Sequence, residues 1–147
     1  MDSTNEMMIE FDSRACNESF ARVAVAAFCT QMNPTLEEVA DIKTAISEAV
    51  TNAIIHAYEN QIHKIRIECK IAGPDLYVTV IDHGKGIEDI RKAMEPLYTT
   101  RPDLERSGMG FAFMEAFMDE IAVASQPGEG TEVHMRKRIG SGASPFA

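Results

Sequence analysis

Glu48 and Asn52 are the first residues whose types and spacing could support chemistry. Four residues apart on a predicted helix, they lie one turn apart on the same face. A carboxylate there could act as a general base, and the amide oxygen beside it could coordinate a metal ion. A solvated polar face is the simpler interpretation, because both residues lie nearly opposite the apolar stripe of the helix. Ile55 shares their face, however, which indicates that something covers it.

A second group follows a predicted strand and comprises Asp82, Gly84 and Gly86 in the sequence DHGKG. Aspartate and glycine are ordinary turn residues, so a tight turn alone would account for them. An aspartate at a strand end could also accept a hydrogen bond from an exocyclic amine, and the glycines would let a ligand approach the backbone closely. The segment is not the dinucleotide-binding fingerprint, because Asp89 stands where the third glycine belongs.

A third group, residues 105–110 (ERSGMG), ends a long polar stretch and precedes a helical pattern. Backbone N–H groups at a helix start, with Arg106 nearby, could bind an anion. A capped helix start without a ligand explains the same residues. The polar stretch before it, residues 96–108, reads as a long loop, and such loops are often functional lids. Gly130 and Thr131 open the last predicted strand and indicate nothing by themselves.

Other common kinds of site find no support in the sequence. The four histidines have no paired metal-ligand spacing, and the three cysteines contain no CxxC motif. We therefore expect reduced thiols in a cytoplasmic protein, with the cysteines in or near the core. No arrangement typical of a serine or cysteine nucleophile is present.

Two long helices are predicted to position these groups. The first covers residues 14–32, and its apolar residues Phe20, Val23, Ala24, Ala27 and Phe28 recur at helical spacing. The second covers residues 36–58 and begins with a capping box formed by Thr35 and Glu38. Its apolar stripe consists of Val39, Ile42, Ile46, Val50, Ala53 and Ala57.

The strand pattern decides the fold class. Short helices are predicted at residues 88–94 and 109–118, and strands at residues 7–11, 65–72, 76–82, 121–124 and 131–139. Because the strands come in hairpins rather than alternating singly with helices, we predict an α+β fold. It would be a two-layer α/β sandwich whose mixed, mainly antiparallel sheet carries helices on one face.

Length and charge narrow the function further. A chain of 147 residues fits one domain, residues 1–147, with a frayed tail at about residues 140–147. A net charge of −9 argues against duplex nucleic acid as the main ligand. The first residues lack a signal-peptide pattern, and the longest apolar run is too short to span a bilayer, so we expect neither secretion nor membrane insertion.

In their order and spacing, these motifs resemble the ATP-binding superfamily of gyrase B, heat-shock protein 90, histidine kinases and MutL. Glu48 and Asn52 resemble its N box, Asp82-x-Gly84-x-Gly86 its first glycine box, and Gly108-x-Gly110 its second. Within the superfamily, roughly residues 6–138 resemble the bacterial anti-sigma factor serine kinases, and the sporulation branch in particular. The stretches that carry this resemblance are residues 17–28, 47–56, 96–111 and 117–120.

The resemblance implies a homodimer that binds Mg-ATP, inhibits an RNA polymerase sigma factor and phosphorylates a serine of an anti-anti-sigma factor. By position, Glu48 would be the general base, Asn52 the Mg²⁺ ligand, Asp82 the adenine contact and Thr131 its support. The remaining positions would contact the nucleotide: Gly84, Gly86, Thr99, Thr100, Arg106 at the γ-phosphate, Ser107, Gly108, Met109 and Gly110. Since two partners must compete, we expect one docking surface that consists of the first helix, including Arg22, together with residues near the lid.

Two residues depart from the family pattern: Ala57 stands where glycine is usual, and His83 lies inside the first glycine box. Neither removes a catalytic group. A general-stress anti-sigma kinase and an ATP-gated sigma-binding module without kinase activity remain alternatives. A detached histidine-kinase domain is disfavoured because no helical hairpin with a phospho-accepting histidine precedes the domain. Gyrase and MutL ATPases need a further domain that 147 residues cannot hold.

Overall fold

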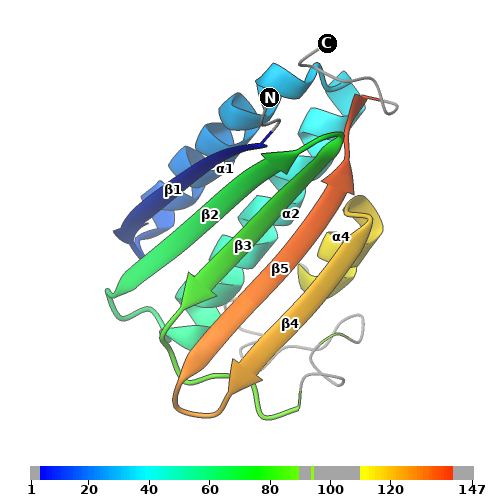
Figure 1. The fold of residues 1–147 in the computed structure, drawn as a ribbon. Helices are drawn as coiled ribbons and strands as arrows, with labels where there is room; N and C mark the ends of the chain where they lie inside the picture. The colour runs from blue at the N-terminus through cyan, green and yellow to red at the C-terminus, as the bar shows by residue number, and fades with distance from the viewer. Residues whose placement is uncertain (1–3, 90–93, 95–109, 141–147) are drawn as a thin grey trace.

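A five-stranded sheet forms one layer of the protein (Figure 1). The structure is a computed structural model, described here for residues 4–89, 94 and 110–140. All four strand pairings are antiparallel, so the expected antiparallel character is confirmed, and the described strands contain no parallel pair. In spatial order the strands are β1 (Thr4–Asp12), β2 (Lys64–Ala72), β3 (Asp75–Asp82), β5 (Gly130–Arg138) and β4 (Glu120–Gln126).

The helices cover one face of this sheet, as the α+β prediction requires (Figure 1). α1 (Ala15–Cys29) and α2 (Leu36–Asn52) pack together, and α2 also packs against α4 (Gly110–Phe117). α2 continues into one π-helical turn, η2 (Ala53–Ala57). Most of the helix predicted at residues 88–94 lies outside the described residues. No helix in the described part of the chain is long and apolar enough to cross a membrane.

The start of α2 is fixed by the capping box that the sequence predicted. The Glu38 backbone N–H donates to Thr35 Oγ1 at 3.1 Å, and the Thr35 N–H donates to Glu38 Oε1 at 2.8 Å. These two bonds satisfy backbone donors that a helix start otherwise leaves unpaired. The Gly140 N–H also donates to the Glu38 carboxylate at 3.2 Å, which connects the end of the described chain to the same point.

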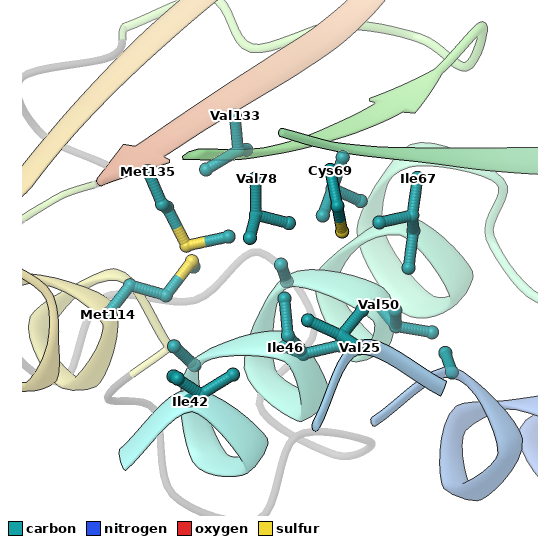
Figure 2. Packing of buried hydrophobic residues seen from close by; sticks show 14 of the residues in the cluster. Val25, Ile42, Ile46, Val50, Ile67, Cys69, Val78, Met114, Val133 and Met135 are labelled. Carbon is teal, nitrogen blue, oxygen red and sulfur yellow. The ribbon is translucent and has the colours of Figure 1, made fainter. Parts of the chain in front are cut away.

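The core lies between the sheet and α2 (Figure 2). Alternate residues of β2 and β3 are buried, as a strand with one covered face requires. They meet the apolar stripe of α2, whose residues Ile42, Ile46 and Val50 are also buried. The buried strand residues are Ile65, Ile67, Cys69, Ile71, Leu76, Val78 and Val80.

The core face of α1 does not carry all the apolar residues whose spacing indicated the helix. Phe20 and Val23 belong to that apolar period, yet each is 54% exposed. The face that packs inward instead carries Ala21, Val25 and Cys29, all fully buried. Small side chains there allow α1 to lie close to α2, so the larger apolar residues remain on the outside. α1 is therefore apolar on two faces, only one of which the described fold covers.

The three cysteines also differ in their exposure. Cys29 and Cys69 are buried, as expected, whereas Cys16 on the outer side of α1 is exposed, contrary to the expectation. Burial raises the pKa of Cys29 to about 11 and that of Cys69 to about 12, so both are neutral thiols at physiological pH. They serve as small apolar packing residues.

Two valines of α1 test this difference in burial. Val25→Ala should lower the free energy of unfolding by about 2 kcal/mol, because it removes two buried methyl groups and leaves a cavity. Val23→Ala, the same change on the exposed face, should alter it by less than about 0.5 kcal/mol. Urea unfolding followed by circular dichroism measures both. Equal losses would mean that both faces of α1 are covered in the isolated protein.

Candidate functional site

Asp82 is the buried acidic residue at the centre of the candidate site. It ends β3, pairs with Thr131 on β5 and is 7% exposed. The backbone N–H groups of Gly84, at 2.9 Å, and Thr131 donate to its carboxylate. Burial nevertheless raises the pKa of Asp82, because its cost exceeds the lowering by these bonds and by His83. A carboxylate has lone pairs for more than two donors, so Asp82 can accept a further hydrogen bond.

The segment after Asp82, residues 83–87, is held on one side by the end of α2. The His83 N–H donates to the Tyr58 hydroxyl at 2.7 Å, and that hydroxyl donates to the Lys64 carbonyl at 2.6 Å. The Lys85 N–H donates to the Ala57 carbonyl at 3.1 Å. The first half of the segment is thereby attached to the π-helical turn that follows α2 and to the residue after it.

The turn between β4 and β5 holds the other side. The Gly128 N–H donates to the Lys85 carbonyl at 2.6 Å, and the Ile87 N–H donates to Ser125 Oγ at 2.8 Å. Ser125 Oγ also lies 2.8 Å from Thr131 Oγ1 and donates to the Gly130 carbonyl at 3.0 Å. Residues 83–87 therefore bridge two parts of the fold that lie far apart in the sequence, and Asp82 is positioned between them.

The structure gives the glycines at positions 84 and 86 a role that does not depend on a ligand. A Cβ atom on Gly84 would overlap the Ala57 backbone, and one on Gly86 would overlap the Gln126 carbonyl. Gly86 also has φ +78°, in the region that favours glycine. Close packing of the segment against its two supports accounts for both glycines, whether or not a ligand approaches their backbone.

The same contacts explain the two departures from the family pattern. The carbonyl of Ala57 accepts from the Lys85 N–H, and the small Ala57 side chain lies beside Gly84. The backbone N–H of His83 donates to the Tyr58 hydroxyl, while the residue itself is exposed. The side chain at position 83 is therefore not needed to hold the segment, and neither departure disturbs the hydrogen bonds around Asp82.

Glu48 and Asn52 lie one turn apart on α2, and both are half-buried. Ile55 is half-buried as well, in agreement with the expectation that this face is covered. Asn52 is the last residue of α2 before the π-helical turn, so the backbone that supports residues 83–87 also places the Asn52 amide. π-Helical turns of this kind often occur at functional sites.

The opposite side of the site is only partly described. Gly110 begins α4, which packs against α2, so it lies on the helix adjacent to the one that carries Glu48 and Asn52. The other predicted contacts on this side lie outside the described residues: Thr99, Thr100, Arg106, Ser107, Gly108 and Met109. In the described chain, no cluster of three or more histidine, cysteine or acidic residues could hold a metal ion. Asn52 would thus need oxygen ligands from elsewhere, such as phosphate groups.

Sequence reasoning missed Tyr58 and Ser125. Neither lies in a motif, and their partners, His83 and Ile87, are 25 and 38 positions away along the chain. Tyr58 also forms one wall of a polar pocket of about 440 Å³ that continues past residues 83–85. The pocket is lined by Ala57, Tyr58, Glu59, Gln61, His63, His83, Gly84 and Lys85.

Comparison with known proteins supports the resemblance. Residues 11–137 match the family model described as the histidine kinase-like ATPase domain. A protein of Thermoanaerobacter sp. (strain X514) named anti-sigma F factor is 60% identical over 141 residues, covering 96% of this chain and 99% of that protein. A Clostridium botulinum (strain Eklund 17B / Type B) protein of the same name is 58% identical over 136 residues, covering 92% of this chain and 95% of its own.

A solved structure shares the fold. The crystal structure of the RsbU and RsbW domains of Rv1364c from Mycobacterium tuberculosis matches with a TM-score of 0.67 at 22% identity. The match covers 92% of this chain and 32% of that one. At this level of identity the similarity extends to the fold alone.

Burial of Asp82 predicts an unusual effect of pH on stability. Because its pKa is raised in the folded state, the ionised carboxylate opposes folding above that pKa, and the penalty vanishes in acid. Asp82→Asn should therefore increase the melting temperature, relative to the unchanged protein, more at about pH 8 than at about pH 4. Thermal unfolding of the ligand-free protein measures this difference.

Asp12 provides the matched control. Its hydrogen bond and ion pair with Lys64 lower the pKa of Asp12, so ionisation favours folding there. The effect of Asp12→Asn should have the opposite pH dependence, becoming more destabilising as the pH rises. The same trend in both variants would contradict the proposed cost of burying Asp82.

Proposed function

The chain belongs to the histidine kinase-like ATPase domain family and, within it, to the anti-sigma F factors, and we propose that it inhibits a sporulation sigma factor of the sigma F type. We further propose that it is a serine protein kinase, which inactivates its anti-anti-sigma factor by phosphorylation. The observation that carries the proposal is about 60% identity over nearly the whole chain to proteins of that name. Its action on RNA polymerase would place it in the cytoplasm.

The nucleotide site of this proposal lies around Asp82. The Asp82 carboxylate, buried and held by two backbone N–H groups, accepts a hydrogen bond from the adenine amine, and Thr131 supports it from β5. Asn52 would hold Mg²⁺ through its amide oxygen, together with phosphate oxygens of the nucleotide. Gly110 at the start of α4, with Gly108 and the neighbouring residues of the motif, would offer backbone N–H groups to the phosphates.

The phosphoryl-transfer step depends on Glu48. Bound Mg-ATP supplies the phosphoryl group, and Glu48 accepts the proton of the partner's serine hydroxyl as that oxygen attacks the γ-phosphorus and ADP leaves. Arg106 stabilises the charge on the transferred group. The half-buried position of Glu48, one turn from Asn52, supports this role, since a base must lie beside the metal and phosphates.

The partner surface of the proposal lies on α1. Arg22 has its side chain 42% exposed and 3.6 Å from Glu18. Phe20 and Val23 present exposed apolar area elsewhere on the same helix. Aromatic residues and arginine are enriched at interfaces, so the sigma factor and the anti-anti-sigma factor would compete for this helix. The homodimer rests on the family resemblance.

Replacing the proposed base should separate catalysis from binding. Glu48→Gln keeps the shape and hydrogen-bonding capacity of the side chain but cannot accept the proton. Phosphorylation of the anti-anti-sigma factor should fall at least about a hundredfold, the lower end of the usual contribution of a general base. A single-turnover assay with radiolabelled ATP measures transfer, while calorimetry measures ATP affinity, which should change little.

Two outcomes would contradict the assignment. Near-normal transfer by Glu48→Gln would leave Glu48 as a polar residue without a catalytic role. Lost ATP binding would make it a ligand contact rather than a base. Glu37→Gln, on the exposed first turn of α2, is the matched control and should leave both quantities unchanged.

A charge reversal on α1 tests the shared surface. Arg22→Glu should weaken binding of both the sigma factor and the anti-anti-sigma factor by tenfold or more, about the cost of an interface hot spot. ATP affinity should remain unchanged, because Arg22 is not part of the site around Asp82. Surface plasmon resonance with each partner measures the effect, and Lys70→Glu on β2 is the control. Loss of one partner only would disprove a common docking surface.

A further inference from the structure

Two hydroxyl groups outside every sequence motif hold the ends of residues 83–87. Tyr58 is 6% exposed, and its hydroxyl accepts from the His83 N–H while donating to the Lys64 carbonyl. A phenol has one proton, and the Lys64 carbonyl fixes where that proton points. The lone pairs are thus directed at His83, immediately after Asp82. Burial raises the pKa of Tyr58, so the hydroxyl keeps its proton at physiological pH.

Ser125 has the corresponding position at the far end. Its hydroxyl donates to the Gly130 carbonyl and accepts from the Ile87 N–H, and it also contacts the Thr131 hydroxyl. When the Ser125 proton points to the Gly130 carbonyl, Ser125 accepts from Thr131. Its hydroxyl then has three hydrogen-bond partners. One side chain thereby fixes both the end of the segment and the residue paired with Asp82.

We propose that Tyr58 and Ser125 are positioning residues of the nucleotide site, which fix the Asp82 carboxylate for the purine amine by holding the segment that follows it. This inference rests on the proposed function. Between the two hydroxyls lies Gly84, whose N–H donates to Asp82 Oδ1. The two backbone bonds of Lys85 remain when either hydroxyl is lost. Loss of a hydroxyl still removes one restraint on the segment, which weakens the positioning of the Gly84 N–H and of the carboxylate that it orients.

A nucleotide without the amine distinguishes positioning from general support. Purine riboside triphosphate lacks the exocyclic amine of ATP but has the same ribose and phosphates. In Tyr58→Phe and Ser125→Ala, ATP affinity should fall about threefold to tenfold, as expected for one lost hydrogen bond, while affinity for the analogue stays the same. Calorimetry well below the melting temperature of each variant measures both affinities.

Matched controls remove a tyrosine and a serine hydroxyl at positions far from the site. Tyr77→Phe changes an exposed tyrosine of β3, and Ser19→Ala an exposed serine of α1; both should bind the two nucleotides normally. Asp82→Ala is the reference, because it removes both acceptor oxygens and should abolish the preference for ATP over the analogue. If Tyr58→Phe does not fold, Ser125→Ala decides the inference by itself.

The outcomes are separable. Equal losses for ATP and the analogue would overturn the inference, since the hydroxyls would then support the fold and not the amine contact. Unchanged affinities would overturn it as well. If only Asp82→Ala loses the preference, the inference fails while the proposed function stands. If Asp82→Ala retains the preference, the adenine assignment of Asp82 fails and this inference fails with it.

Discussion

A carboxylate buried at the end of a central strand is the constraint on which the rest of this structure depends. Desolvation raises the free energy of the ionised Asp82, and two backbone N–H groups offset only part of that cost. Those N–H groups must therefore stay in place, which requires a rigid segment after the strand. Residues 83–87 gain that rigidity from supports on both sides, and close packing against those supports leaves no space for a side chain at Gly84 or Gly86.

The second long helix connects this constraint to the core. One side of α2 carries the apolar stripe that packs on the sheet, and another carries Glu48 and Asn52. Its π-helical end supplies the Ala57 carbonyl that binds the segment after Asp82. Packing of α2 on the sheet therefore fixes the position of Glu48 and Asn52 and also that of the segment after Asp82. A domain of this size can achieve such precision without a disulfide or a structural metal.

Local signals made most of the fold predictable from the sequence. The capping box at Thr35, the alternating burial of β2 and the hairpin connections depend on neighbouring residues, and each is as expected. The motif residues Glu48, Asn52 and Asp82 were also recognisable, because their spacing reflects helix and strand geometry. Tyr58 and Ser125 were not, because their roles exist only once distant segments meet. The reason for the glycines likewise depends on backbone contacts that no local pattern contains.

The exposure of the larger apolar residues of α1 has a physical cause and a consequence for function. Apolar residues occupy two sides of this helix, so periodicity alone favours the side with the larger residues. Packing favours the other side, since Ala21 and Val25 permit a close approach to α2, whereas Phe20 would hold the helices apart. Exposed apolar area is costly unless a partner covers it, and here it lies on an element whose inner face already stabilises the domain. The outer face of α1 can therefore diverge to fit different partners without loss of the core or of the site around Asp82.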